Sequence, residues 1–270
     1  MKNTIFVLGI LALFLAACKP DSKSTAETAG TSIDTRTLLA GHWVALDFCS
    51  RANQYGSVLA AMNNAHLPYA FAVSFDPNKP DSAICYNGIE KWALPVKITA
   101  DTIEMLNARP GKSVFLIYHS QGNKEMSMFD GTTGTMQLDK FIKSKANARD
   151  GYLAFTVALN HNLFNGVFTQ LGKGGKNNIQ FTPGGFIMNW GPFDRYEVCT
   201  NGDCFMAGNE IDVMTVSKST VENSEKYYGF RYSAQNDTLT LYNLATTNPD
   251  EKGTYQPKGI AYQFFRKPAE

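Results

Sequence analysis

After residue 36 the chain alternates between apolar and polar side chains in runs of roughly five to eight residues, with turn residues between the runs. The run YAFAVSF (residues 69–75) has this alternation. So has YYGFRY, in which Tyr228, Phe230 and Tyr232 fall on one face of a strand. A period of two is typical of strands that bury one face, and a meander of such strands can close into a barrel. The pattern predicts an all-β fold.

Two segments break the strand pattern. The segment RANQYGSVLAAMNNAH (residues 51–66) is rich in alanine, with Val58, Leu59 and Met62 at helical spacing. It predicts a short amphipathic helix after the first strand, placed to cover one mouth of a barrel. The segment ARDGYLAFTVALNHN (residues 148–162) is too apolar for a plain linker, and it predicts an extra strand or helix.

The sequence also contains an internal repeat. Five pairs of similar segments follow one another in the same order: 38–43 with 163–168, 73–77 with 179–183, 102–106 with 210–214, 114–130 with 227–243, and 140–144 with 263–267. The fourth pair aligns without a gap. An ordered set of matches predicts two related units of about 110 residues, a normal domain size. One large barrel that spans both halves is the rival topology.

The stretch YHSQG resembles the G-x-S-x-G elbow that presents a nucleophilic serine in α/β-hydrolases, with Ser120 as the serine. The elbow requires a strand, a sharp turn and then a helix. The residues that follow Ser120 alternate as a strand does, and Tyr118 stands where the elbow needs glycine. HSQGNK is therefore predicted to be a hairpin loop, and a serine hydrolase is a remote alternative.

The first residues have the features of an export signal. Lys2 precedes an uninterrupted apolar stretch, residues 5–17, which is too short to span a bilayer comfortably. The stretch ends in LAAC, which resembles the lipobox of bacterial lipoproteins. The resemblance implies that residues 1–18 are the signal peptide with its lipidation cysteine, and that acyl chains on Cys18 anchor the mature chain. Residues 19–35 lack aromatic side chains and are expected to form a disordered tether.

These features predict a location in the cell envelope, with the lipid anchor as the contact to the membrane. Lys19 follows the cysteine, where an aspartate would favour the inner membrane of enteric bacteria, so the outer membrane is favoured. The formal net charge is +1, and the basic residues form no block, which argues against a nucleic-acid partner. The histidines and cysteines show no metal-ligand spacing, and no catalytic constellation is present. We expect no metal, no cofactor and no enzymatic activity.

Four cysteines remain after Cys18, and an even number in an exported chain favours disulfides. Asn201-Gly202 is a strong signal for a two-residue hairpin turn. The turn places Cys199 and Cys204 on a non-hydrogen-bonded pair of positions, within reach of a disulfide. Cys49 and Cys85 form the remaining pair by parity alone. For Cys199 and Cys204 the alternative is two free, half-buried thiols.

The opening strand LLAGHWVALDF resembles that of the lipocalins, where G-x-W marks the start of the barrel, here Gly41 and Trp43. In that family a basic residue near the end of the last strand stacks on the tryptophan. Lys143 takes this place in the first unit, and the second unit has Arg266 opposite Phe168.

The resemblance implies two tandem lipocalin-like antiparallel β-barrels, with the short helix after the first strand of the first barrel. Their expected bounds are residues 36–147 and 163–270, and the junction covers residues 148–162. The predicted function is the binding of a small apolar or amphipathic ligand inside a barrel.

The expected ligand-binding residues are Trp43, Tyr228, Phe230 and Arg231, the last of which would meet a carboxylate if it points inward. The plainer interpretation is that the aromatic rings fill the cores and that Arg231 is solvated. The alternative function is an interaction or inhibitor module whose loops dock an envelope protein or a host protein.

Overall fold

The computed structural model describes residues 35–63, 65–88, 90–122, 124–131, 136–172, 178–200, 211–246 and 255–267. All of them belong to one compact unit, Asp34–Glu270. The predicted signal peptide, the lipidation of Cys18 and nearly all of the predicted tether lie outside the described residues. None of the described helices is long and apolar enough to cross a membrane.

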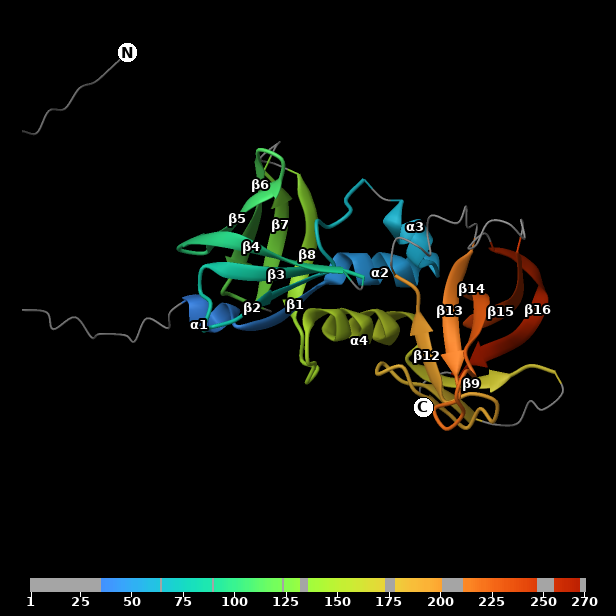
Figure 1. Cartoon of the computed structure of the whole chain (residues 1–270). Coiled ribbons are helices and arrows are strands. Elements are labelled where there is room, and N and C mark those ends of the chain that lie inside the picture. The colour runs from blue at the N-terminus through green and yellow to red at the C-terminus, as the bar shows by residue number, and fades with distance from the viewer. Residues whose placement is uncertain are drawn as a thin grey trace, which may run out of the picture. The chain divides into compact units, whose positions relative to one another are not determined.

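The first half of the unit forms a closed barrel of eight antiparallel strands, in which each strand pairs with its neighbours in the sequence (Figure 1). Its strands are β1 (Gly41–Ala45), β2 (Ala72–Phe75), β3 (Ser82–Asn87), β4 (Glu90–Thr99), β5 (Thr102–Arg109), β6 (Lys112–His119), β7 (Glu125–Asp130) and β8 (Gln137–Lys143). The barrel closes where β1 pairs with β8, with Trp43 opposite Lys143. One large barrel spanning both halves is therefore not formed, and the prediction of a barrel in the first half is confirmed.

The second half forms an open sheet of eight antiparallel strands in the order β11-β10-β9-β16-β15-β14-β13-β12. Its strands are β9 (Gly166–Gln170), β10 (Asn178–Phe181), β11 (Ile187–Met188), β12 (Arg195–Val198), β13 (Asp212–Ser217), β14 (Lys226–Ser233), β15 (Thr238–Thr246) and β16 (Tyr255–Arg266). Only an isolated bridge, Phe186 to Arg195, joins β11 to β12.

The prediction of a second closed barrel is therefore wrong, and the local sequence gives the physical reason. Strand β11 has two residues and β12 has four. Pro183 and two glycines precede β11, and Gly191 and Pro192 separate it from β12. Proline cannot donate to a ladder and glycine weakens a strand, so the sheet stays open at this point.

Helices occupy the ends of the first barrel and the junction between the halves: α1 (Thr35–Leu39), α2 (Leu46–Tyr55), α3 (Val58–Met62) and α4 (Gly151–Leu163). The predicted helix after the first strand is confirmed, although it begins at Leu46 and is divided in two. Gly56 ends α2 with a positive φ of 61°. A Cβ at Gly56 would lie 1.7 Å from the carbonyl oxygen of Tyr232, so only glycine allows the helix end to contact β14. The apolar junction segment is a helix, one of its two predicted forms.

The helices α2 and α4 pack together where β1 runs into α2. The ring of Phe71, just before β2, lies 4.5 Å from Phe48 of α2 and 4.9 Å from Phe155 of α4, measured between ring centroids. The main-chain N–H of Ala45 donates to the carbonyl oxygen of Phe71 over 2.9 Å. This aromatic group holds both helices at that end of the barrel.

A buried ion pair ties α2 to β8. The carboxylate of Asp139, on the inner face of β8, accepts hydrogen bonds from Arg51 Nη2 at 3.1 Å and from the main-chain N–H of Asp47 at 3.0 Å. Its side chain has no exposed surface. Burial raises the pKa of Asp139 to about 7, with a further contribution from the charge of Asp47, and these effects outweigh the favourable pairing with Arg51.

The second half also contacts the helices of the first. One carboxylate oxygen of Asp212, at the start of β13, accepts hydrogen bonds from the main-chain N–H groups of Val58 and Leu59, both at 2.9 Å. These groups lie in the first turn of α3, where helix N–H groups have no partner within the helix. Ser57, the residue just before α3, caps the same turn, because its hydroxyl accepts a hydrogen bond from the N–H of Ala60.

The two sheets share the register of their first strands. Gly41 of β1 lies opposite Phe75 of β2, and Gly166 of β9 lies opposite Phe181 of β10. These positions agree with the internal repeat found in the sequence. The two halves differ most in their third and fourth strands. β3 and β4 pair over six residues, whereas β11 and β12 are joined by the isolated bridge alone.

The repeat departs from the ungapped alignment in one hairpin. Tyr118 of β6 lies opposite Met126, and the equivalent of Met126 in β15 is Leu239, which lies opposite Tyr232. The ungapped match of residues 114–130 would instead make Tyr118 equivalent to Arg231. The second hairpin loop is one residue shorter, so the alignment requires a gap there.

The predicted disulfide between Cys49 and Cys85 is not formed, since both are buried free thiols. Cys49 lies in α2, whereas Cys85 points into the barrel and contacts the sulfur of Met105 at 3.9 Å. Burial raises the pKa of Cys85 to about 12 and raises that of Cys49 further, so both remain protonated. The other predicted bridge stays a prediction, because Cys204 lies outside the described residues.

Candidate functional site

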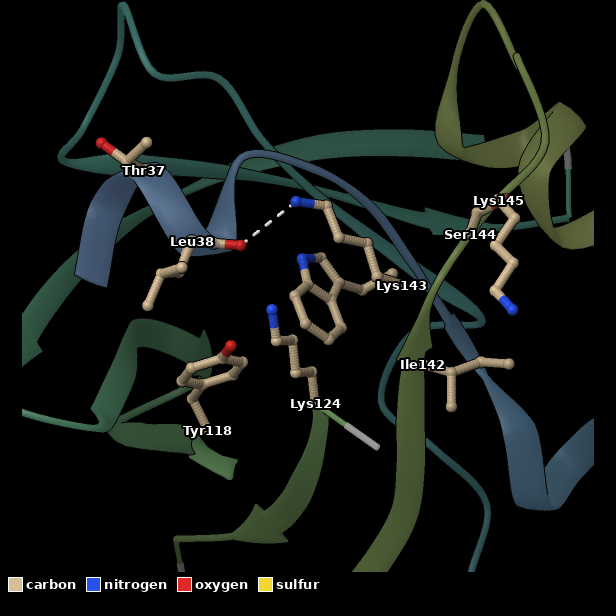
Figure 2. A pocket seen from close by; sticks show the side chains of 9 residues that line it. Thr37, Leu38, Tyr118, Lys124, Ile142, Lys143, Ser144 and Lys145 are labelled. Atoms are coloured by element: carbon tan, nitrogen blue, oxygen red, sulfur yellow. Dashed lines mark hydrogen bonds between the residues drawn. The ribbon is translucent and has the colours of Figure 1, made fainter. Parts of the chain in front are cut away.

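A pocket of about 560 Å³ lies at the end of the first barrel where β1 begins. It is bounded by α1, by the start of β1, by the hairpin between β6 and β7, and by the end of β8 (Figure 2). Nine residues line it: Thr37, Leu38, Trp43, Tyr118, Lys124, Ile142, Lys143, Ser144 and Lys145. Its volume lies within the range of roughly 300–1,000 Å³ that is usual for small-molecule sites.

Trp43 is fixed at the base of this pocket by contacts on two sides. Its indole Nε1 donates to the carbonyl oxygen of Leu39 over 2.7 Å, which satisfies one of the open carbonyls at the end of α1. Its ring meets the edge of Tyr118 at 5.9 Å between centroids. Trp43 is only 1% exposed, so it forms a rigid base for the pocket.

Lys143 reaches across this tryptophan. Its ammonium lies 5.9 Å from the centre of the indole and donates to the carbonyl oxygen of Leu38 over 3.1 Å (Figure 2). The predicted cation over Trp43 is therefore confirmed. Gly41 makes room for it, because a Cβ there would lie 3.1 Å from Lys143 Cε, and because its φ of 115° is one that other residues rarely adopt.

The lining combines positive charge with apolar surface. Lys124, Lys143 and Lys145 are exposed, and no acidic residue is among the nine that line the pocket. Figure 2 shows the side chains of Lys124 and Lys143 extending over the pocket, while that of Lys145 points away. Leu38 and Ile142 are half-buried and supply aliphatic walls.

The equivalent corner of the second half is built differently. The guanidinium of Arg266 lies 5.2 Å from the ring centre of Phe168 and 4.9 Å from that of Tyr232, and it donates to the carbonyl oxygen of Leu163 over 2.7 Å. The predicted contact between Arg266 and Phe168 is confirmed. Arg266 Nε is fully buried, whereas Lys143 is exposed, so the arginine packs between two rings instead of bordering a pocket.

The structure does not bring the four predicted ligand-binding residues together. Trp43 lines the pocket of the first barrel. Tyr228 and Phe230 are packed in the core of the second sheet, Tyr228 beside Tyr262 at 5.7 Å and Phe230 beside Phe164 at 5.3 Å. Arg231 points away from that core and is exposed, on a separate groove.

Sequence reasoning missed most of the pocket. Tyr118, Lys124 and Ile142 come from strands and a hairpin that only the closure of the barrel brings beside Trp43. One signal was available for Lys145, because it stands two residues after Lys143 at the end of the predicted last strand. An extended segment would place both lysines on one face, although in the structure the side chain of Lys145 points away from the pocket.

Ser120 lies in the loop between β6, which ends at His119, and β7, which begins at Glu125. The predicted hairpin loop is confirmed, and the strand-turn-helix arrangement of a nucleophile elbow is not present at Ser120. His119 Nε2 lies 3.0 Å from the hydroxyl of Ser127, a diagonal neighbour on β7, since His119 itself pairs with Glu125. Among the described residues, no group of three or more His, Cys, Asp or Glu side chains is placed to hold a metal ion.

Comparison of the chain with family models, with curated proteins and with solved structures gives no match. The antiparallel eight-stranded barrel is established by the structure itself. Because a fold does not identify a family, membership of the lipocalins continues to rest on Gly41, Trp43 and Lys143 and stays a prediction.

Proposed function

We propose that this chain is a lipid-anchored protein of the cell envelope whose first barrel binds a small anionic amphiphile in the pocket at Trp43. The ligand class is an apolar body that carries one acid group, as in a fatty acid. The observation that carries the proposal is the pocket lining, which joins aliphatic and aromatic walls to lysines without an acidic residue.

The apolar part of the ligand would lie against the half-buried side chains of Leu38 and Ile142 and the edge of Tyr118. Covering such surface is favourable by about 25 cal/mol for each Å² of apolar area removed from water. The walls come from a helix and three strands of a closed barrel, so the pocket is formed before the ligand arrives. A preformed pocket lowers the ordering cost of binding.

The acid group of the ligand would pair with Lys124 and Lys143. Lys143 keeps donor capacity after its hydrogen bond to Leu38, because an ammonium carries three N–H groups. A carboxylate held by two ammonium groups gains charge-assisted hydrogen bonds in a partly desolvated site. Lys145 adds positive potential at the rim, which attracts an anion toward the pocket.

The binding proposal is tested by titrating sodium dodecanoate into the full chain and measuring heat release by calorimetry. We expect saturable binding, and Lys124→Ala should weaken it by about tenfold, since it removes one charge-assisted contact. Lys97→Ala is the matched control, because Lys97 is an exposed lysine on the outer side of β4. Absence of saturable binding, or equal weakening by both variants, would refute the proposal.

The envelope location is supported by the apolar segment at residues 5–17 and the LAAC sequence that ends at Cys18. Mass spectrometry of the protein extracted from bacterial membranes tests it. We expect a mature amino terminus at Cys18 that carries a diacylglyceryl group, and Cys18→Ser should leave the protein uncleaved. A mature chain without lipid contradicts the anchor but leaves the binding proposal standing.

A further inference from the structure

A second groove, of about 530 Å³, lies on the outer face of β14, β15 and β16, next to the end of α2. Its lining is mostly hydroxyl, amide and main-chain groups: Gln54, Tyr55, Arg231, Tyr232, Ser233, Ala234, Gln235, Asn236, Thr238, Thr240, Tyr242 and Gln263. The pocket at Trp43 shares none of these residues, so the groove is a separate candidate site.

The floor of the groove is a row of polar side chains in register across three strands. Arg231 of β14 lies opposite Thr240 of β15, and Thr240 lies opposite Gln263 of β16. Gln263 Nε2 contacts Thr240 Oγ1 at 3.5 Å. Because strand side chains alternate between faces, this row points away from the core that holds Phe230 and Leu241.

Two tyrosines border this polar floor. Tyr55, from the last turn of α2, is 48% exposed, and Tyr242 of β15 is half-buried. The end of α2 is fixed against β14, since the N–H of Tyr232 donates to the carbonyl oxygen of Gly56 over 3.3 Å. The ring of Tyr55 is therefore held at the edge of the groove, where it offers an apolar face and a hydroxyl that can hydrogen-bond to water.

Arg231 is the one charged residue among those that line the groove, and it is exposed. The carboxylate of the adjacent hairpin, Asp237, accepts a hydrogen bond from the hydroxyl of Tyr232 over 2.9 Å. Within the part of the chain that the structure describes, Arg231 forms no ion pair. Its planar guanidinium can therefore bind a carboxylate through two parallel hydrogen bonds.

We propose that this groove binds an acidic saccharide, a sugar chain with a carboxylate on at least one ring. Amide and hydroxyl groups can donate to and accept from sugar hydroxyls in both directions. The exposed ring of Tyr55 offers a flat apolar surface for the C–H face of a pyranose. Arg231 supplies the partner for the acid group. A single cation is too little charge for a nucleic acid, which requires several phosphate contacts.

The test is calorimetric titration of the full chain with two tetrasaccharides. One is a hyaluronan tetrasaccharide, which carries glucuronate, and the other is chitotetraose, which is neutral. We expect the hyaluronan tetrasaccharide to bind more tightly than chitotetraose. Arg231→Gln should weaken hyaluronan binding by about tenfold or more, since a charge-assisted hydrogen bond is lost. Tyr55→Ala should weaken the binding of both sugars.

Tyr227→Ala is the matched control, because Tyr227 is 51% exposed on the same strand as Arg231 but lies outside the groove. The proposal is overturned if neither tetrasaccharide binds, if chitotetraose binds as tightly as the acidic sugar, or if Arg231→Gln behaves as Tyr227→Ala does. Dodecanoate binding of Arg231→Gln should match that of the wild type. This measurement separates a failure of the groove from a failure of the proposed pocket at Trp43.

Discussion

The closed barrel and the open sheet begin and end in the same way and differ in the middle. In both, the first strand pairs with the last, and a cation on the last strand lies over an aromatic ring on the first. The first half then has a six-residue ladder between β3 and β4, whereas a single bridge joins β11 to β12. Closure of these sheets therefore depends on the middle strands, while the shared ends only set the register.

The interiors of the two sheets differ as well. The closed barrel combines sulfur-containing and aliphatic side chains, including Cys85 and Met105 in contact, with separate rings such as Trp43 and Phe141. The open sheet is filled by aromatic rings, and Phe181 alone lies within 6.5 Å of five of them. Large rings that interdigitate can fill a core even when strand pairing does not continue all the way round the sheet. The second half therefore stays packed although its sheet is open.

The largest difference is expected between two equivalent phenylalanines. Phe181→Ala should lower the free energy of unfolding by about 4 kcal/mol, because it removes a fully buried ring from the aromatic cluster. Phe75→Ala, the equivalent change in the barrel, should lower it by about 3 kcal/mol, because Phe75 is 7% exposed. Urea denaturation of both variants measures the difference, and a larger loss for Phe75→Ala would contradict the role of the aromatic cluster.

The next comparison concerns the two cations. Arg266→Ala should cost about 2–3 kcal/mol of stability, since it removes contacts with two rings and a hydrogen bond to Leu163. Lys143→Ala should cost about 1 kcal/mol, because Lys143 is exposed and contacts one ring. Thermal unfolding at matched pH measures both, and equal losses would show that the two corners are energetically alike.

A pH-dependent difference is expected at Asp139, whose equivalent in the second half is Tyr262. The folded pKa of Asp139 is about 7, above its ordinary value of 3.8. The contribution of Asp139 to the free energy of unfolding is therefore fully present below about pH 4 and is lost as the pH rises toward 7. Relative to Asp139→Asn, the wild type should lose on the order of 2 kcal/mol between about pH 5 and pH 8.

Denaturant unfolding at several pH values measures this loss. Asp81→Asn is the control, because the side chain of Asp81 is 83% exposed and its substitution should leave the pH profile unchanged. A constant difference in stability between the wild type and Asp139→Asn would contradict the raised pKa.

A smaller effect is expected from a substitution that makes the corner at Trp43 resemble the corner at Arg266. Lys143→Arg keeps the charge but adds a guanidinium that can pack between Trp43 and Tyr118, as Arg266 packs between its two rings. We expect dodecanoate affinity to fall by about tenfold, or about 1.4 kcal/mol, because the added group fills the pocket. Lys97→Arg is the control for the chemical change alone. Unchanged affinity in Lys143→Arg would show that the pocket does not depend on the size of this side chain.

Much of the fold was predictable because alternation is a local signal. The strand that carries Tyr228, Phe230 and Tyr232 follows the alternation, whereas the pairing of Lys143 with Trp43 was predicted from the resemblance to the lipocalins. The failure of the second sheet to close was not predictable, because it depends on whether β11 and β12 are long enough to pair. The proline and glycine residues around β11 were visible in the sequence, but their effect on the sheet is a long-range one.

The candidate sites were less predictable than the fold. The pocket at Trp43 includes residues from α1 and from the β6–β7 hairpin, and no spacing in the sequence relates these segments. The outer groove is also formed from segments that are distant in the sequence, since Tyr55 and Arg231 are brought together by the contact of Gly56 with Tyr232. Alternation did predict one feature correctly, because Arg231 lies on the face opposite to Phe230.

The carboxylate of Asp212 has a consequence for the order in which the chain acquires structure. The first turn of α3 finds this acceptor 154 residues farther along the sequence. During synthesis or export the first barrel therefore emerges while α3 is capped by Ser57 alone, before Asp212 adds a second acceptor worth about 1 kcal/mol. Asp212→Ala should accordingly speed amide exchange at Val58 and Leu59 while leaving the barrel strands protected, and unchanged exchange at both amides would refute this coupling of early and late segments.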